Sequence, residues 1–156
     1  MVFKVCLCFK AEPLTINDHE LLKNIGQALN GKRYKVIIVD DGSTDETKNA
    51  IKKLAKTHPV MRIGYAKNKG PGYAFKFGFN YLIPKIKDGD IVITLEADNT
   101  ADFSIIPKMI SKTKKYDVVL SSPYAKGGAF LGISLTRRIL SLISNFLDKQ
   151  IFRIKN

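Results

Sequence analysis

The sequence predicts an α/β protein built on a largely parallel sheet, with helices on both faces of that sheet. Apolar runs of strand length alternate along the chain with stretches of helical spacing, which is the pattern of such folds. Two of these runs end in carboxylates, at 40–41 and at 96–98, and ligands of open α/β sheets bind at the carboxyl ends of strands. With 156 residues, 45% of them hydrophobic, the chain is about one globular domain long.

The first three apolar runs are predicted to be strands, because each is short and most are bounded by turn-forming residues. A helix should follow the first strand, since Asn17 or Asp18 can cap its start and Gly31 lies just past its end. Ser43 and Glu46 have capping-box spacing, which predicts that the second helix begins directly after Ser43. The predicted elements are, in order, a strand at 2–9, a helix at 17–30, a strand at 34–39, a helix at 44–56 and a strand at 61–66.

The second half continues the alternation of helices and strands. A basic glycine loop precedes an amphipathic helix, and a further apolar run then ends in the second group of acids. The apolar side of that helix carries Ala74, Phe75, Gly78, Phe79 and Leu82. The predicted elements are a loop at 67–72, the helix that follows it, a strand at 90–95, a helix at 104–114, a strand at 117–121 and a helix within 130–147.

The charge balance favours anionic partners. Lys and Arg number 26 against 14 for Asp and Glu, which gives a net charge of +12. Phosphates, nucleic acid and an anionic membrane are all compatible with this charge. In so basic a chain, carboxylates at the ends of apolar strands indicate a binding site. They would either bind a divalent cation or accept hydrogen bonds from a ligand.

The two groups of acids suit these two purposes differently. Glu96 and Asp98 are two residues apart, so both side chains can lean to one side and share a hard cation such as Mg²⁺ or Mn²⁺. Asp40 and Asp41 precede Gly42 at a tight turn, where they can accept hydrogen bonds from a base or a ribose. A turn with a helix cap, or a solvated strand end, is the purely structural alternative for each group.

The glycine loop is a candidate phosphate site. Gly70-Pro71-Gly72, with Lys67, Lys69 and the start of the following helix, suits a diphosphate, although an ordinary loop before a helix has the same composition. The sequence contains no GxxxxGK[ST] and no strand that leads into GxGxxG. Neither an ATPase P-loop nor a dinucleotide-binding fingerprint is therefore present.

Four segments in this order resemble a known family. They are VIIVDDGSTDET at 36–47, NKGPGYA and the later Gly78 at 68–78, LEAD at 95–98, and DVVLSSPYAKGG at 117–128. Together they are similar to family 2 glycosyltransferases of the GT-A fold, and within that family to the dolichol-phosphate mannosyltransferase group. The resemblance covers nearly the whole chain.

The resemblance implies a set of site residues. It assigns sugar-nucleotide binding to Glu12, Asp40, Asp41, Lys69, Gly70 and Ala97. It assigns the metal, Mg²⁺ or Mn²⁺, to Glu96 and Asp98, and it counts Glu96, Asp98 and Arg138 as catalytic. It assigns the acceptor phosphate to Arg137, Arg138 and Ser141.

The implied reaction is an inverting transfer of a hexose, mannose or glucose, to a polyprenyl phosphate of the dolichyl type. The donor would be GDP-mannose or UDP-glucose, because the same motifs serve both. A lipid phosphate is already a nucleophile, so no strong general base is required. A nucleic-acid partner is not expected, because the acids at the strand ends would repel phosphate unless a metal intervened.

The same resemblance predicts the domain organisation. Residues 1–128 would form the GT-A catalytic domain that binds the sugar nucleotide. Residues 129–156 would form an amphipathic helix on the acceptor or membrane-interface side, with a buried core helix as the alternative. Members of the family continue well past Asn156, so we expect the acceptor side to be truncated in this chain, with a partner subunit as one way to complete it.

The predicted location is cytoplasmic, peripheral to the cytoplasmic face of a membrane. No run approaches the roughly 20 apolar residues that a spanning helix requires. The first ten residues also lack the order of a basic region, an apolar run and a cleavage site that marks a signal peptide.

The chain departs from the family pattern at three places. Glu96 stands where the family usually has Asp, and Pro123 stands where an arginine is usual. After the first strand, only Glu12 remains of the acidic motif that lines the base. These departures keep an alternative open, in which the chain is a catalytically weak sugar-nucleotide-binding remnant or a partner subunit of a glycosyltransferase.

Overall fold

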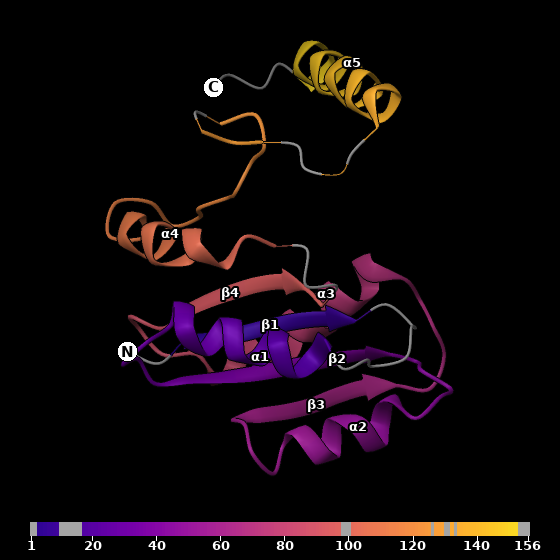
Figure 1. The fold of residues 1–156 in the computed structure, drawn as a ribbon, viewed down its shortest axis with the longest axis vertical. Coiled ribbons are helices and arrows are strands. Elements are labelled where there is room, and N and C mark those ends of the chain that lie inside the picture. The colour runs from indigo at the N-terminus through magenta and orange to yellow at the C-terminus, as the bar shows by residue number, and fades with distance from the viewer. Residues whose placement is uncertain are drawn as a thin grey trace. The chain divides into compact units, whose positions relative to one another are not determined.

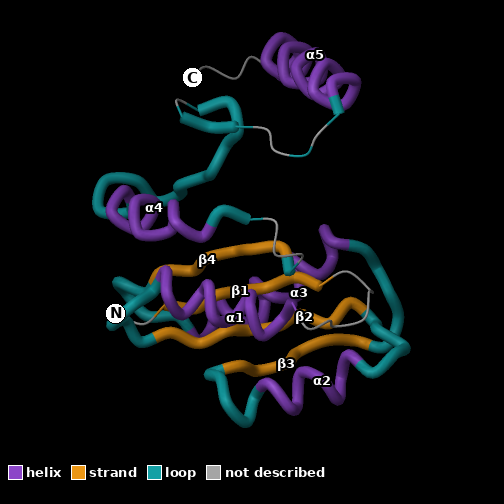
Figure 2. The backbone as a smooth tube through the Cα atoms, viewed as in Figure 1, coloured by secondary structure: helices purple, strands orange, loops and turns teal. Residues whose placement is uncertain are grey.

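The computed structural model describes residues 3–9, 17–97, 101–125, 127–129, 132 and 134–152. The chain divides into two compact units, Met1–Asp117 and Val118–Asn156, and each is considered by itself. Figure 2 shows the strands gathered in the first unit and a long helix in the second. The functional division expected at residue 128 stays a prediction.

The first unit is built on a parallel sheet. Among the described residues, four strands form one sheet in the order β3-β2-β1-β4, and every pair of neighbours is parallel (Figure 1). The strands are β1 (Phe3–Phe9), β2 (Tyr34–Asp41), β3 (Val60–Tyr65) and β4 (Ile91–Glu96). The predicted parallel α/β architecture is therefore confirmed for this unit.

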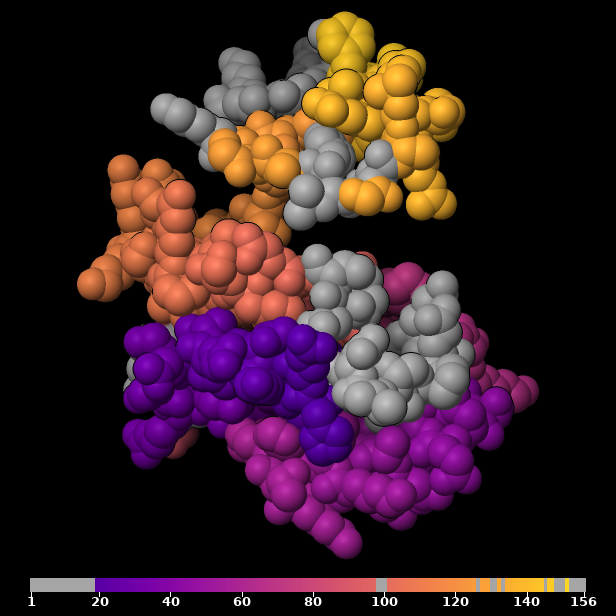
Figure 3. Space-filling model, in the orientation of Figure 1, coloured from indigo at the N-terminus to yellow at the C-terminus, as the bar shows by residue number. Residues whose placement is uncertain are grey.

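Helices cover both faces of this sheet. The first face packs against α1 (Asn17–Ala28), α2 (Thr47–Leu54) and α4 (Ile106–Lys112), whose apolar residues form one cluster with those of the strands. In Figure 1 α1 lies in front of the sheet, and the space-filling view shows that its side chains cover the strands behind it (Figure 3). The opposite face packs against α3 (Pro71–Leu82).

The helix α3 follows its predicted apolar pattern except at one residue. Ala74, Gly78 and Leu82 are buried, as the spacing predicts, and Phe75 packs against the same cluster. Phe79 is 41% exposed, so the prediction that it lies on the buried side is wrong. A short 3-10 helix, Ile83–Lys85, then leads toward β4, and another, Phe103–Ile105, leads into α4.

The second helix begins later than the capping pattern predicts. It starts at Thr47, and the hydroxyl of Ser43 is buried with no hydrogen-bond partner among the described residues. The amide of Ser43 instead donates to Oδ1 of Asp40 at 2.8 Å, and Oδ1 of Asp45 accepts from the Thr47 amide at 2.9 Å. The predicted capping box is therefore wrong, because Asp40 takes the Ser43 amide that Glu46 would have accepted, and the Ser43 hydroxyl has no partner among the described residues.

The predicted strand at 117–121 is not formed. This segment has no strand partner among the described residues, and Val118 and Leu120 are 73% and 82% exposed. A strand is stabilised by its neighbours, so a short apolar run without an adjacent strand forms none. The predicted helix at 104–114 is confirmed as the 3-10 turn followed by α4, and Asp102 caps its start by accepting from the Ser104 amide.

The second unit contains the predicted amphipathic helix, α5 (Leu135–Phe152). The hydroxyl of Ser134 accepts a long hydrogen bond from the Arg137 amide at 3.4 Å, which is the contact of a helix N-cap. Its exposed apolar residues are Leu135, Ile139, Leu140, Leu142, Ile143, Phe146, Leu147 and Ile151. Over the part of the chain that the structure describes, no helix is both long enough and apolar enough to cross a membrane.

Candidate functional site

The first acid of the predicted site, Asp40, is buried within an ion pair. Its side chain is 0% exposed, although it lies at the end of β2. Nε and Nη2 of Arg62, on the neighbouring strand β3, donate to Oδ2 of Asp40 at 2.8 and 2.5 Å. Because the Ser43 amide occupies Oδ1, both oxygens of this carboxylate are engaged within the protein.

These contacts keep Asp40 ionised. Burial by itself would raise the pKa of the Asp40 carboxyl, but the hydrogen bonds from Ser43 and the Arg62 guanidinium outweigh it. The pKa of Asp40 is therefore lowered from its ordinary value. The resulting carboxylate is a fixed internal charge, paired with Arg62 on the neighbouring strand and with Ser43 in the turn that follows β2.

The second acid, Asp41, holds the glycine loop. Its Oδ1 accepts from the Lys69 amide at 2.8 Å and its Oδ2 accepts from the Gly70 amide at 2.9 Å. The amide of Gly70 also lies 3.1 Å from Oδ1 of Asn68. The backbone donors that precede α3, which the sequence suggested for a diphosphate, are thus engaged by an internal carboxylate.

The turn after β2 and the glycine loop touch at their backbones. Gly42 has φ +72°, and a Cβ placed on it would lie 2.4 Å from both the carbonyl carbon of Lys67 and the nitrogen of Asn68. Only glycine fits so close an approach in a left-handed conformation. The two loops therefore form one packed unit at the carboxyl edge of the sheet.

The two aspartates face opposite sides of the sheet. Val36 and Ile38 pack on the face covered by α1, whereas Ile37 and Val39 pack on the face covered by α3. Strand alternation continues this pattern, so Asp40 belongs to the α1 face and Asp41 to the α3 face. By the same alternation Glu96 lies on the face of Val92, which packs in the α3 cluster. Asp41 and Glu96 are thus the acids that share a side.

The position of Glu96 fits a metal or sugar-nucleotide site. Glu96 ends β4 and is exposed. In the register of the sheet it pairs with Cys8 on β1, and Cys8 pairs in turn with Val39 on β2, so all three positions lie side by side across the sheet. The strand order reverses between β1 and β4, and such a reversal is where open α/β sheets bind ligands. No described residue forms a hydrogen bond or an ion pair with the Glu96 carboxylate, so its oxygens suit a hard cation.

Two predicted site residues lie outside the described residues. These are Glu12, in the segment after β1, and Asp98, in the segment after β4. Within the described part of the chain, no three His, Cys, Asp or Glu side chains are grouped closely enough to hold a metal ion. Ala97, which directly follows Glu96, packs partly buried against the cluster on the α1 face.

Lys69 carries its charge over aromatic rings. Its ammonium lies 4.3 Å from the ring centre of Tyr73 and 5.8 Å from that of Tyr65. Tyr65 packs edge-on against Tyr73 and Phe77, so β3 and α3 supply one aromatic cluster beneath the ammonium. The cluster thus fixes the side chain of Lys69, whose backbone amide Asp41 holds.

The predicted acceptor-phosphate residues lie on α5 in the second unit. Arg137 and Arg138 are exposed in its first turns, and Ser141 follows at positions i+4 and i+3, which share a helix face. The hydroxyls of Ser141 and Tyr124 form a hydrogen bond. The structure thus joins α5 to the segment around Pro123, where the family usually carries an arginine.

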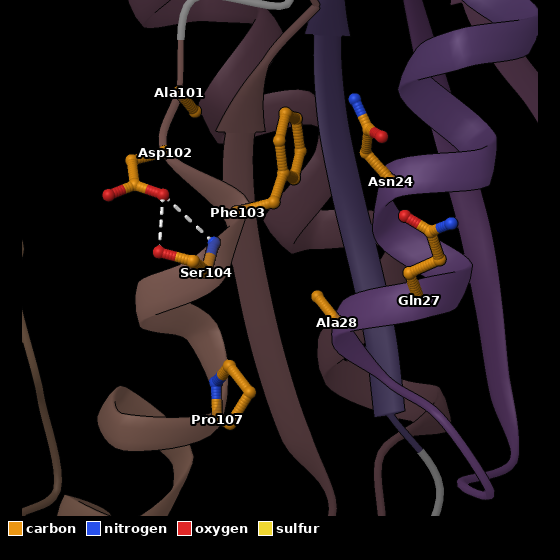
Figure 4. A pocket seen from close by; sticks show the side chains of 8 residues that line it. All are labelled: Asn24, Gln27, Ala28, Ala101, Asp102, Phe103, Ser104 and Pro107. Carbon is orange, nitrogen blue, oxygen red and sulfur yellow. Dashed lines mark hydrogen bonds between the residues drawn. The ribbon is translucent and has the colours of Figure 1, made fainter.

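A cavity of about 530 Å³ lies elsewhere in the first unit. Figure 4 shows Asn24 and Gln27 of α1 on one side of it and Phe103 with the capped turn at Asp102 on the other. The hydrogen bonds from Ser104 lower the pKa of Asp102, which is exposed at the rim of this cavity. None of the residues that line this cavity is a predicted site residue.

Sequence reasoning missed two contributors to the site. One is Arg62, whose charge within the otherwise apolar run VMRIGY is a signal that could have indicated a buried acidic partner. The other is Tyr124, for which no local pattern predicts a contact with Ser141, 17 residues away.

Comparisons with known proteins show which family the chain resembles. The family model described as Glycosyl transferase family 2 matches residues 8–156. The dolichol-phosphate mannosyltransferase of Pyrococcus furiosus is 33% identical over 126 residues, which make up 80% of this chain and 34% of that protein. The undecaprenyl-phosphate 4-deoxy-4-formamido-L-arabinose transferase of Edwardsiella ictaluri is 34% identical over 105 residues, 64% of this chain and 31% of that protein. The chain therefore spans about a third of the length of these relatives.

Solved structures show a likeness of fold. S. aureus TarS matches with a TM-score of 0.52 at 20% identity, over 74% of this chain and 20% of TarS. S. aureus TarS 1-349 in complex with UDP-GlcNAc matches with a TM-score of 0.50 at 19% identity, over 75% of this chain and 32% of that chain.

Proposed function

This chain belongs to glycosyl transferase family 2, and on that premise we propose that it moves a hexose from a nucleotide-diphosphate sugar to a polyprenyl phosphate. Its α/β architecture is of the GT-A type, as the sequence predicts. The observation that carries the proposal is that Asp41 and Glu96 lie on one side of the sheet at its carboxyl end, with Glu96 at the point where the strand order reverses. Two relatives whose names specify dolichol phosphate and undecaprenyl phosphate support a lipid phosphate as acceptor.

The proposed roles divide the site between donor and acceptor. Asp41 fixes the glycine loop, so the ammonium of Lys69 stands beside the place where the donor diphosphate would lie. Glu96 and Asp98 would hold Mg²⁺ or Mn²⁺, which when bound neutralises charge on the diphosphate leaving group. Glu12, Gly70 and Ala97 keep the donor-side roles that the resemblance assigns to them, whereas the buried Asp40 would act on the donor only through the turn that it holds.

The proposed reaction is a direct displacement with inversion. An oxygen of the acceptor phosphate forms a bond to the anomeric carbon while the bond from that carbon to the diphosphate oxygen breaks. The electron pair of the broken bond leaves with the nucleoside diphosphate. Arg137, Arg138 and Ser141 would bind and orient the acceptor phosphate, which needs no general base because it is already an anion.

We propose that α5 brings the chain to the cytoplasmic face of a membrane. Its exposed apolar side chains would bury themselves among lipid chains, while Arg137 and Arg138 pair with lipid phosphate. The net charge of +12 favours the same anionic surface. A nucleic-acid partner stays outside the proposal.

A second candidate function is a sugar-nucleotide-binding subunit with little activity of its own. The observation that favours it is Pro123, which stands where members of the family usually carry an arginine. In that case a partner subunit would supply the missing charge on the acceptor side.

The experiment that tests these proposals is transfer of radiolabelled sugar to a short polyprenyl phosphate. GDP-mannose and UDP-glucose serve as donors, each with Mg²⁺ or Mn²⁺, for the unmodified chain and for Asp98→Ala. Asp88→Ala, which changes an exposed aspartate away from the site, is the matched control. We expect metal-dependent transfer from one donor, lost in Asp98→Ala and kept in Asp88→Ala.

Three outcomes separate the hypotheses. Transfer as described supports the enzyme and identifies its donor. Metal-dependent binding of a nucleotide sugar by calorimetry, without transfer, supports the binding subunit. An absence of both binding and transfer would overturn the donor site itself.

A further inference from the structure

The ion pair between Arg62 and Asp40 has a geometry that a surface contact lacks. Two guanidinium nitrogens meet one carboxylate oxygen at 2.8 and 2.5 Å, and the Ser43 amide meets the other at 2.8 Å. The Asp40 side chain is 0% exposed and that of Arg62 is 30% exposed. A carboxylate enclosed in this way has one orientation, because each of its oxygens has its own donors.

A gain in folding stability does not by itself account for this ion pair. Buried ion pairs are often no more stabilising than apolar side chains of similar volume, since both charges lose their hydration. Val36 and Ile38 of β2 and Val60 of β3 already give this face an apolar packing. The distinctive contribution of Arg62 is therefore orientation: it fixes Asp40, which in turn fixes the Ser43 amide and the turn that follows β2.

The position of this turn is transmitted to the glycine loop. Gly42 lies within it and approaches the backbone of Lys67 and Asn68 so closely that no Cβ fits between them. Asp41 precedes Gly42 and holds the amides of Lys69 and Gly70. A shift of the turn would therefore move or release both contacts that hold the loop.

We propose that Arg62 is a positioning residue for the sugar-nucleotide site: through Asp40 it fixes the turn after β2, and through that turn it places Lys69 and the glycine loop. The residue does not touch the donor in this proposal and acts only through Asp40. The inference rests on the proposed function, because the loop is placed for a nucleoside diphosphate.

The test compares three variants with the unmodified chain. Arg62→Met removes the charge but keeps an unbranched side chain, and Arg62→Lys keeps the charge but not the planar fork. Arg33→Met makes the same change at an exposed arginine and is the control. For each protein, hydrogen exchange is measured at the amides of Ser43, Lys69 and Gly70, and calorimetry measures the Kd for GDP and UDP in the presence of Mg²⁺.

We expect Arg62→Met to speed exchange of the Lys69 and Gly70 amides roughly tenfold while the sheet amides stay protected. The Kd for the nucleotide that binds should rise by roughly tenfold, since a misplaced loop loses its alignment with the diphosphate. Arg62→Lys should lie between Arg62→Met and the unmodified chain, and Arg33→Met should match the latter. A purely structural role would instead speed exchange throughout the sheet.

The failures of the two proposals are distinguishable. If the unmodified chain binds neither nucleotide, the proposed function fails, and the exchange data still report on the link from Arg62 to the loop. If it binds one but folded Arg62→Met has unchanged loop exchange or an unchanged Kd, the positioning role is overturned. Should Arg62→Met not fold, the double variant Asp40→Leu/Arg62→Met replaces the pair with apolar side chains and undergoes the same measurements.

Discussion

Asp41 accepts hydrogen bonds from the amides of both Lys69 and Gly70, at 2.8 and 2.9 Å, so the last residue of β2 holds the loop that enters α3. This contact links two of the segments by which the chain resembles its family. It also uses the backbone donors just before α3, while the Lys69 ammonium lies 4.3 Å from the ring centre of Tyr73. Asp41 and the glycine loop therefore form one hydrogen-bonded unit.

Replacing Asp41 with asparagine should weaken its contact with the glycine loop. Asparagine keeps one side-chain oxygen, but its NH₂ group replaces the other. That group faces a backbone N–H, which is also a donor, so one hydrogen bond to a backbone amide is lost. We expect the free energy of unfolding to fall by roughly 1–3 kcal/mol, as measured by urea denaturation. Asp88→Asn, at an exposed position, is the control and should change it by less than about 0.5 kcal/mol. Equal effects of the two changes would contradict the role given to Asp41.

Gly42 offers a matched pair of glycine substitutions. Gly42 and Gly31 have φ of +72° and +71°, but a Cβ on Gly31 has no atom within 4 Å, whereas one on Gly42 meets backbone atoms at 2.4 Å. Gly31→Ala should therefore cost only the backbone strain, about 1–2 kcal/mol. Gly42→Ala should cost clearly more, because the glycine loop must also move. Thermal unfolding of both variants measures the difference, and similar melting temperatures would show that the two loops are not tightly packed.

The ion pair of Asp40 predicts a pH dependence of stability. The folded-state pKa of Asp40 lies below the ordinary value of 3.8, so its stabilising contribution is fully present above pH 3.8 and is lost as the pH falls through the folded pKa. We expect the difference in unfolding free energy between the unmodified chain and Asp40→Asn to be constant from pH 7 to about pH 5. That difference should shrink below pH 3.8.

Urea denaturation at a series of pH values measures this difference. Exposed carboxyls such as Asp102, whose pKa is lowered by its hydrogen bonds from Ser104, titrate in both proteins, so their effect cancels. A difference that stayed constant down to pH 3 would mean that the pKa of Asp40 is not lowered by folding.

The contact between Ser141 and Tyr124 predicts a change in the use of the acceptor. Both side chains are exposed, so Ser141→Ala should alter the free energy of unfolding by less than about 0.5 kcal/mol. If Ser141 binds the acceptor phosphate as proposed, the KM for polyprenyl phosphate should rise by roughly tenfold with little change in the KM for the donor. Ser144→Ala, on the same helix, is the control, and steady-state transfer rates give both constants.

Local patterns predicted most of the architecture. The order of strands and helices, the parallel sheet and the cover on both faces follow from apolar periodicity and turn residues, which act over a few positions. The start of α2 could not be predicted in this way. Ser43 has the spacing of a cap, but Asp40 takes its amide, and Asp40 is fixed in turn by an arginine 22 residues away.

The unformed strand at 117–121 has a similar cause. Its short apolar run is typical of a strand, yet a strand exists only where a neighbour pairs with it, and that neighbour is not encoded in the segment itself. The acids at the strand ends were predicted as a site from topology alone. That Asp40 and Asp41 would face opposite sides, one toward Arg62 and the other toward the glycine loop, required the packing of β3 and α3.

The contacts that join the turn after β2 to the glycine loop connect residues 28 and 29 positions apart. Such contacts close a long loop of chain, which costs entropy before any gain is realised. They can form only after β3 has docked beside β2 through its crossover. Assembly of this edge should therefore be a late event in folding, and a nascent or partly unfolded chain would lack it even where its helices have already formed.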